Sequence, residues 1–136
     1  MIFDSNVVID LLDGTSPDNV ANFIGGLLAE NNACINEIIF AEVSARYPSA
    51  QVALVQLRTL GLALRRLSPE DCHRAGTAFA QYRRDGRDRT RILPDFLIGA
   101  HAAGQGWPIV TRDRKGFAKY FPEVDLIDPY EDHSRA

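Results

Sequence analysis

The chain opens with MIFDSNVVIDLL, residues 1–12, in which one acid separates two apolar runs. Residues 1–3 form a short apolar run, which favours a buried strand. From residue 6 to residue 12, apolar side chains recur at the spacing of one helical face, at Val8, Ile9, Leu11 and Leu12. The stretch therefore predicts a buried strand that leads directly into a helix, with Asp4 at the junction.

The same alternation continues along the rest of the chain. Helical patterns lie at 19–30, 37–47, 50–60, 69–84, 94–104 and 114–120, and short apolar runs lie at 33–35, 62–64, 108–110 and 124–127. Strands that alternate with helices are typical of a parallel sheet covered on both faces. We therefore expect an α/β fold, a three-layer α/β/α sandwich around about five short parallel strands. Residues 1–129 are expected to form one domain, followed by a polar, frayed tail at 130–136.

Composition and charge set limits on function. Of the 136 residues, 46% are hydrophobic and 24% are charged, as in an ordinary globular domain. The net charge of −3 argues mildly against a nucleic-acid binder, yet five arginines gather between residues 83 and 91. The two cysteines, Cys34 and Cys72, match no zinc spacing, and no leader or membrane-spanning run is visible. We therefore expect a cytoplasmic protein without membrane association.

Four acids occupy positions where chemistry is expected. Asp4 and Asp113 directly follow predicted strands, Asp95 begins a helix, and Glu42 lies in an apolar helical stretch. Ligands of open parallel sheets bind outside the carboxyl ends of the strands. Each acid also has a structural explanation, because Asp95 could complement a helix dipole, Asp113 could cap a helix, and Glu42 could point into solvent. If all four converge, their like charges need a cation, and oxygen ligands without His or Cys select Mg²⁺ or Mn²⁺.

Four motifs along the chain resemble those of one known family. They are FDSNVVI at 3–9, IIFAEV at 38–43, PDFLIGAHA at 94–102 and IVTRDRKGF at 109–117. In the order and spacing of these motifs the chain resembles the PIN-domain family, and within it the VapC-type toxin ribonucleases of toxin–antitoxin systems. The resemblance spans essentially the whole chain. It implies a PIN-like sheet with an acidic site at the carboxyl ends of its strands.

The resemblance also implies roles for particular residues. The catalytic, metal-binding acids would be Asp4, Glu42, Asp95 and Asp113, with Mg²⁺ or Mn²⁺ as the cofactor. Asn6 and Thr111 would orient the carboxylates or a water without being ligands, although Asn6 could equally cap the first helix. The implied reaction is hydrolysis of an RNA backbone by an activated water, which leaves a 5′-phosphate and a 3′-hydroxyl.

Basic residues near the motifs are candidates for RNA contact. Three lie in the loop after residue 86, and two flank Asp113: Arg87, Arg89, Arg91, Arg112 and Arg114. The loop could equally be a solvated charged segment. The resemblance further implies two protein partners, a small VapB-type antitoxin and a second copy of the chain in a homodimer.

Two other functions stay open. A magnesium-dependent phosphatase-like α/β domain would need a second Asp two residues after Asp4, and the chain has Asn6 there. A catalytically inactive PIN-like module that binds RNA or protein would have no need of the four acids, and all four are present. Ribonuclease activity is therefore the function that we expect.

Overall fold

One parallel sheet forms the centre of the computed structural model, which describes residues 1–86 and 91–132. Within this part of the chain, five two-residue strands pair side by side: β1 (Ile2–Phe3), β2 (Cys34–Ile35), β3 (Ala63–Leu64), β4 (Ile109–Val110) and β5 (Leu126–Ile127). Their order across the sheet is β3-β2-β1-β4-β5, and all four neighbouring pairs are parallel. The predicted α/β fold around a parallel sheet of short strands is confirmed.

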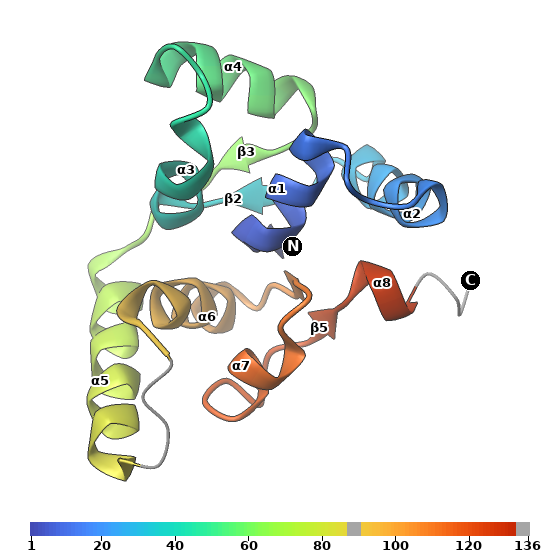
Figure 1. Cartoon of the computed structure of the whole chain (residues 1–136). Helices are drawn as coiled ribbons and strands as arrows, with labels where there is room; N and C mark the ends of the chain where they lie inside the picture. The colour runs from blue at the N-terminus through green and yellow to red at the C-terminus, as the bar shows by residue number, and fades with distance from the viewer. Residues whose placement is uncertain (87–90, 133–136) are drawn as a thin grey trace.

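Helices cover this sheet on two sides. The described residues form α1 (Ser5–Asp13), α2 (Asp18–Ala29), α3 (Glu37–Ser44), α4 (Ala50–Thr59), α5 (Pro69–Asp85), α6 (Leu93–Gln105), α7 (Arg114–Ala118) and α8 (Pro129–Asp132). In Figure 1, α1, α3 and α4 lie on one side of the sheet, and α5, α6 and α7 lie on the other. This arrangement is the predicted three-layer sandwich.

The strand order places a topological switch point beside β1. From β1 the chain moves outward through β2 to β3, and it then returns to the other side of β1 to form β4 and β5. Loops that leave β1 and β4 therefore diverge to opposite faces, which opens a crevice at the carboxyl ends of these two strands. The register pairs Ile2 with Ile109 and Phe3 with Val110. Asp4 and Thr111 consequently follow the two strands at the same level.

The hydrophobic core packs around the central strands. Ile2 and Phe3 of β1 and Ile109 and Val110 of β4 are fully buried, whereas β3 and β5 at the sheet edges are half-buried. Side chains buried on both faces explain why these strands are continuous apolar runs rather than alternating patterns. A second group of packed rings joins α5 and α6 to the chain after α7: Phe79, Tyr82, Phe96, Tyr120 and Phe121.

Several helix ends follow from the sequence, and others differ from the prediction. Ser68 caps α5 as expected: its hydroxyl accepts a hydrogen bond from the Asp71 amide at 3.1 Å, and Asp71 bonds back to the Ser68 amide. The helix predicted over 37–47 ends earlier, at Ser44, and α7 ends at Ala118 rather than at residue 120. Pro48 disfavours helical geometry in the residue before it, which opens the last turn of α3.

The segment after residue 128 is more ordered than predicted. Pro129–Asp132 forms α8, which packs against α2. The Tyr130 hydroxyl donates a hydrogen bond of 2.8 Å to Asp10 Oδ2 in α1. The expectation of a frayed tail is therefore wrong for these residues, because an aromatic side chain fixes them to the domain. No helix in the described ranges 1–86 and 91–132 is long and apolar enough to cross a membrane.

Candidate active site

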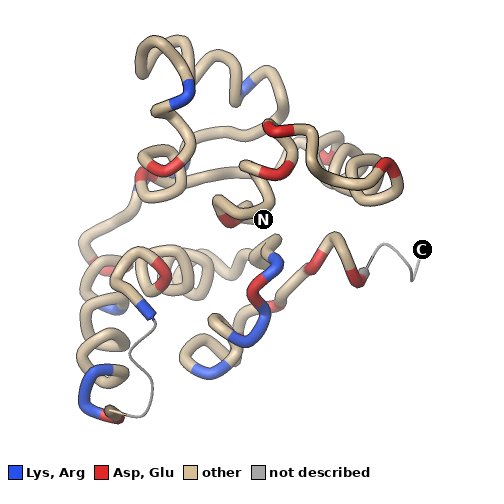
Figure 2. Tube along the Cα trace, viewed as in Figure 1, with Lys and Arg blue, Asp and Glu red and all other residues tan. Residues whose placement is uncertain are grey.

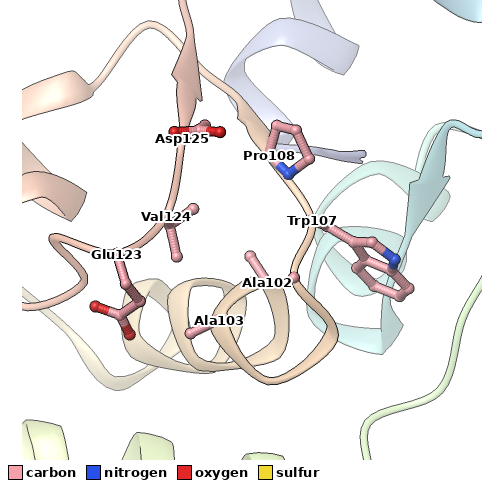
Figure 3. A pocket seen from close by; sticks show the side chains of 8 residues that line it. Ala102, Ala103, Trp107, Pro108, Glu123, Val124 and Asp125 are labelled. Atoms are coloured by element: carbon pink, nitrogen blue, oxygen red, sulfur yellow. The ribbon is translucent and has the colours of Figure 1, made fainter.

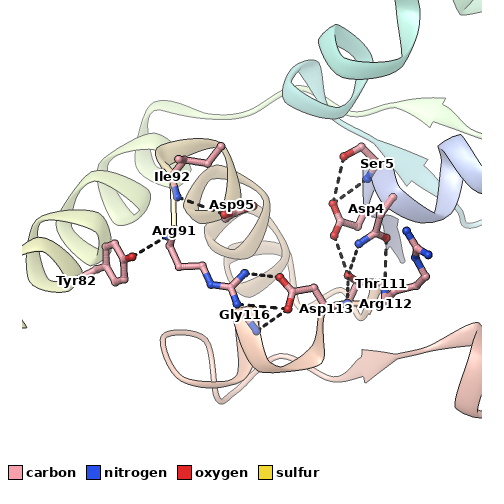
Figure 4. Close-up of polar contacts among 11 residues, drawn as sticks. Asp4, Ser5, Tyr82, Arg91, Ile92, Asp95, Thr111, Arg112, Asp113 and Gly116 are labelled. Atoms are coloured by element: carbon pink, nitrogen blue, oxygen red, sulfur yellow. Dashed lines mark hydrogen bonds and ion pairs between the residues drawn. The ribbon is translucent and has the colours of Figure 1, made fainter. Parts of the chain in front are cut away.

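Asp4 lies at the switch point between β1 and β4. Its amide donates a hydrogen bond to Val110 O at 2.8 Å, which continues the β1–β4 pairing. The residue is 8% exposed, and both oxygens of its carboxylate accept hydrogen bonds. Oδ1 accepts from the Ser5 amide at 2.8 Å, and Oδ2 accepts from the Thr111 hydroxyl at 2.8 Å (Figure 4). The side chain is thus held in one orientation at the carboxyl ends of both strands.

Glu42 is connected to Asp4 through Ser5. The Ser5 hydroxyl donates to Glu42 Oε1 at 3.1 Å and lies 3.5 Å from Asp4 Oδ1. Glu42 is on an exposed part of α3, and α3 packs against α1, where Ser5 is the first residue. The carboxylate of Glu42 therefore turns toward the carboxylate of Asp4, although its helix face is open to solvent.

The pKa of Asp4 reports the electrostatic environment of this site. The pKa is raised to about 6, chiefly by burial and also by the negative charges of Asp95 and Glu42, whereas the hydrogen bonds from Thr111 and Ser5 lower it. Asp95 and Glu42 thus both lie within electrostatic range of Asp4. Ionised Asp4 lacks sufficient compensation from the protein, so a cation near it would be stabilised.

Asp95 faces the same space from the first turn of α6. Its Oδ2 accepts a hydrogen bond from the Ile92 amide at 3.4 Å, which is the contact of an acid at a helix start. Burial raises the pKa of Asp95, the nearby Arg91 guanidinium lowers it, and Asp113 raises it. Asp95 therefore lies within electrostatic range of both Asp4 and Asp113.

Asp113 is both a helix cap and a member of the acidic group. As the cap of α7 it accepts a hydrogen bond from the Gly116 amide at 3.1 Å, so the structural explanation of this residue is confirmed. Its own amide donates to the Thr111 hydroxyl at 2.9 Å. Its carboxylate is ion-paired with Arg91.

Thr111 and Asn6 make hydrogen bonds beside the acids, and the orienting role that the resemblance implies for them stays a prediction. Thr111 is fully buried, and its hydroxyl joins the Asp4 carboxylate to the Asp113 amide. Asn6 does not cap α1, which begins at Ser5 and is capped by Asp4. Its side chain instead accepts a hydrogen bond from the Arg112 amide at 3.4 Å and donates to Thr111 Oγ1 at 3.5 Å. Both residues therefore stabilise the loop that carries Asp113.

The donor set of the site fits a hard divalent cation. Asp4 is linked to Glu42 through Ser5, to Asp113 through Thr111, and to Asp95 through space. Carboxylate oxygens without sulfur or imidazole suit Mg²⁺ and Mn²⁺ rather than Zn²⁺. Across residues 1–86 and 91–132, however, no three Asp, Glu, His or Cys side chains are gathered closely enough to hold an ion as they stand. The acids share an electrostatic field, and binding an ion needs a further approach of their side chains.

The predicted RNA contacts have carboxylate partners where the structure describes them. Arg112 Nε lies 3.2 Å from Asp10 Oδ2, and its guanidinium lies over the Tyr130 ring. Arg114 Nε lies 3.6 Å from Glu131 Oε2 in α8. Figure 2 shows basic positions on the segment that leads from β4 into α7, with an acidic position between them. Arg87 and Arg89 lie outside the described residues, and the role in RNA contact of all five arginines stays a prediction.

Ser5 makes a contact beside the acids that the sequence analysis did not predict. Its hydroxyl lies between the carboxylates of Glu42 and Asp4. The signal that could have found it is its position at the first turn of a helix, next to an acid and opposite the helix of Glu42. A serine there has its hydroxyl free to bridge two carboxylates.

A cavity at the other end of the sheet is separate from the acids. It measures about 60 Å³ and lies at the amino ends of β4 and β5, where Trp107, Pro108 and Val124 contribute to its wall (Figure 3). The parallel strands run away from it, so Asp4 and Asp113 lie at the opposite end of the strands, their carboxyl end. The chemistry of the cavity is accordingly not that of the acidic site.

Together, the parallel sheet and the acids at its switch point define an α/β domain with an acidic site at the carboxyl ends of its strands. Comparison by sequence identifies the class more closely, since the PIN domain profile matches residues 1–121. The chain belongs to the PIN domain family. No curated protein matches it in sequence.

Solved structures share the fold over nearly the whole chain. One is VapBC2 from Rickettsia felis bound to a DNA fragment from its promoter, with a TM-score of 0.67 and 21% identity, covering 93% of this chain and 97% of the other. VapBC-1 from nontypeable Haemophilus influenzae gives a TM-score of 0.69 and 20% identity, covering 96% and 100%. A toxin–antitoxin complex from Klebsiella pneumoniae gives 0.65 and 24%, covering 96% and 98%. At these identities the likeness establishes the fold.

Proposed function

We propose that this chain is a metal-dependent endoribonuclease that acts as the toxin of a toxin–antitoxin pair. The observation that carries the proposal is Asp4, a buried carboxylate whose pKa is raised to about 6 and which is linked to three other acids at the switch point. The proposed ligands of Mg²⁺ or Mn²⁺ are Asp4, Glu42, Asp95 and Asp113. Membership of the PIN domain family supports the proposal, because PIN domains are typically nucleases that use a divalent metal ion.

The residues of the chain would prepare the site for hydrolysis of a phosphodiester. Thr111 and Ser5 fix the two oxygens of Asp4, and Ser5 also turns Glu42 toward it. A divalent ion bound by the carboxylates supplies charge neutralisation for the scissile phosphate and activation of the attacking water. Attack by this water on the phosphorus, with the 3′ oxygen as the leaving group, would give a 5′-phosphate and a 3′-hydroxyl.

We further propose that arginines beside the acids bind the RNA backbone. Arg112 and Arg114 flank Asp113, and Arg87, Arg89 and Arg91 belong to the loop before α6. A phosphate would have to compete with Asp10 for Arg112 and with Glu131 for Arg114. Replacing Arg112 and Arg114 by Gln should therefore weaken RNA binding. The slope of log affinity against log salt concentration should also fall by the equivalent of about two phosphate contacts. An unchanged salt slope in a filter-binding titration would remove both arginines from the interface.

The proposed partners are a VapB-type antitoxin and a second copy of the chain in the cytoplasm. The solved structure from Klebsiella pneumoniae supports the first partner, since it is by name a toxin–antitoxin complex. Helix α4 and the residue after it support it independently, because they expose four large apolar side chains that a partner could cover: Val52, Leu54, Val55 and Leu60. Co-expression with a VapB-type antitoxin should yield one complex. Light scattering should give a mass for the toxin that is twice the 15.1 kDa of a single chain.

Cleavage of a labelled, structured RNA tests the proposed activity. Wild type, Asp4→Asn and the matched control Asp18→Asn would be compared with Mg²⁺ or Mn²⁺, and then with EDTA. Asp18 is an exposed acid at the start of α2, so its variant should cleave as wild type does. We expect cleavage that EDTA abolishes and that Asp4→Asn lacks. RNA binding without cleavage by wild type would instead favour the inactive binding module, and equal cleavage by Asp4→Asn would contradict the assigned site.

A further inference from the structure

Arg91 is fixed at both ends within the acidic site. Its backbone amide donates a hydrogen bond of 2.7 Å to the Tyr82 hydroxyl in α5. Its guanidinium faces the Asp113 carboxylate with two nitrogens: Nη1 pairs with Oδ2, and Nη2 lies 3.5 Å from Oδ1 (Figure 4). The two-pronged arrangement is the geometry that guanidinium groups favour on carboxylates. Both oxygens of Asp113 are therefore directed at a positive charge that belongs to the protein.

Gly116 provides the space for this pair. A Cβ atom on Gly116 would overlap Asp113 Oδ2 and both Nη1 and Cζ of Arg91. The backbone of Gly116 does not have the positive φ that favours glycine elsewhere in the chain. Glycine is thus needed at this position for room and not for backbone freedom. Any side chain there would push the guanidinium or the carboxylate out of its place.

The charge of Arg91 extends to a second acid. Arg91 lowers the pKa of Asp95, and Asp113 raises it, so the guanidinium lies within electrostatic range of Asp95 as well as of Asp113. The side chains of Arg91 and Asp113 are only 25% and 36% exposed, which limits screening by solvent. Within the described residues, by contrast, no basic side chain contacts the Asp4 carboxylate, and burial together with the charges of Asp95 and Glu42 raises its pKa. The acidic group thus has one end compensated by Arg91 and one end that is not.

We propose that Arg91, seated over Gly116, is an internal counter-ion of the acidic site that competes with a divalent cation for Asp113. The inference rests on the proposed metal-dependent function and adds to it an order of binding. A divalent ion binds first at Asp4, whose carboxylate contacts no guanidinium of the residues that the structure describes. Asp113 becomes a ligand only when the Arg91 guanidinium leaves it. The protein therefore binds the ion more weakly than its four acids alone would.

Titration with Mn²⁺, followed by the electron paramagnetic resonance signal of the free ion, tests this inference without measuring activity. Arg91→Gln removes the guanidinium charge, and Arg83→Gln removes one charge from an exposed position on α5 as the matched control. We expect Arg91→Gln to bind Mn²⁺ about fivefold more tightly than wild type, as loss of a half-buried ion pair suggests. Arg83→Gln should differ from wild type by less than about twofold, since its charge is screened.

Gly116→Ala provides an independent variant that keeps the arginine. Its methyl group should displace the guanidinium from Asp113 and so tighten Mn²⁺ binding in the same direction. If Gly116 acts by seating Arg91, the same substitution made in the Arg91→Gln background should add little, and the double-mutant cycle should be strongly non-additive. Thermal melting of each variant without metal verifies that it is folded before the titration.

The outcomes separate this inference from the proposed function. Mn²⁺ binding that Asp4→Asn abolishes, together with equal affinity of Arg91→Gln and Arg83→Gln, would overturn the counter-ion role and leave the metal site intact. Weaker binding by Arg91→Gln would also overturn it and would show that Arg91 supports the ion. Failure of every variant to bind Mn²⁺ would contradict the proposed function itself and, with it, the competition at Asp113.

Discussion

At the scale of single residues, Asp4 is the side chain on which the site depends. It is buried at the junction of β1 and α1, where its oxygens cap the helix and accept the Thr111 hydroxyl. Its pKa is nevertheless raised, since two hydrogen bonds do not offset burial beside Asp95 and Glu42. A residue that destabilises the fold when it ionises is poorly explained by structure alone, and its environment is typical of a functional group.

The raised pKa of Asp4 gives a pH-dependent prediction for Asp4→Asn. The Asp4 carboxyl binds its proton more tightly in the folded state than in the unfolded chain, so the protonated group stabilises the fold. This stabilisation is fully present below about pH 4 and is lost as pH rises through about 6. At pH 8, without metal, the free energy of unfolding of Asp4→Asn should exceed that of wild type by about 1–3 kcal/mol, so the variant should be the more stable protein. The difference should vanish near pH 4. Urea denaturation at both pH values measures it, and a less stable variant at pH 8 would contradict the assigned environment.

Much of the residue-level site could be predicted from the sequence, and some of it could not. Asp4 and Asp113 follow apolar runs that could be identified as strands, so their position at the sheet edge follows from local pattern. Pairing of Arg91 with Asp113 depends on residue 91 lying beside the start of α7, which no local pattern encodes. The bridging role of Ser5 likewise requires that α1 pack against α3.

At the scale of elements, α6, which carries Asp95, packs closely against the chain that follows α7, the helix capped by Asp113. Gly99 lies in the middle of α6 and is buried against the Phe121 ring. A helix interior is an unfavourable place for glycine, so its presence indicates a need for space. The α6 sequence could suggest this from one glycine in a helical pattern, but the identity of the neighbour, Phe121, comes only from the fold.

Two glycine substitutions should change stability in opposite directions. In Gly99→Ala the new Cβ would overlap the Phe121 ring, and we expect a loss of about 1–3 kcal/mol from overpacking. Gly26→Ala in α2 is the matched control, because its Cβ meets nothing within 4 Å and alanine favours the helix by about 0.5–1 kcal/mol. Thermal melting of both variants tests the pair. Equal stabilisation by both would show that α6 is not packed closely at Gly99.

At the scale of the whole molecule, the acids lie at the switch point of the sheet, and α8 packs close to them. The strand order brings β1 and β4 side by side, and α8 returns to this edge through Tyr130 and Glu131. The parallel sheet followed from the alternation of strands and helices, whereas the strand order depends on long-range packing that the alternation does not specify. The ordering of α8 could not be predicted from local sequence, because it depends on the hydrogen bond between the Tyr130 hydroxyl and Asp10, which is distant in the chain.

The contact of α8 with α1 gives a prediction for Tyr130→Phe. The variant keeps the ring under Arg112 and loses the hydrogen bond of 2.8 Å to Asp10 Oδ2. We expect a loss of about 0.5–1.5 kcal/mol in the free energy of unfolding and faster amide exchange in α8. Tyr47→Phe, three residues after α3, is the control for the chemical change. Unchanged exchange in α8 would show that the hydroxyl does not hold this helix.

The central claim is that the acids at the switch point form one site for a divalent cation. The most direct measurement is a crystal structure of the protein soaked in Mn²⁺, with the ion located by its anomalous scattering. We predict one anomalous peak in direct contact with carboxylate oxygens of Asp4 and Asp95, on the side that Glu42 faces, and no such peak in Asp4→Asn crystals. An absence of Mn²⁺ at Asp4, or a peak bound only by acids elsewhere in the chain, would contradict the account.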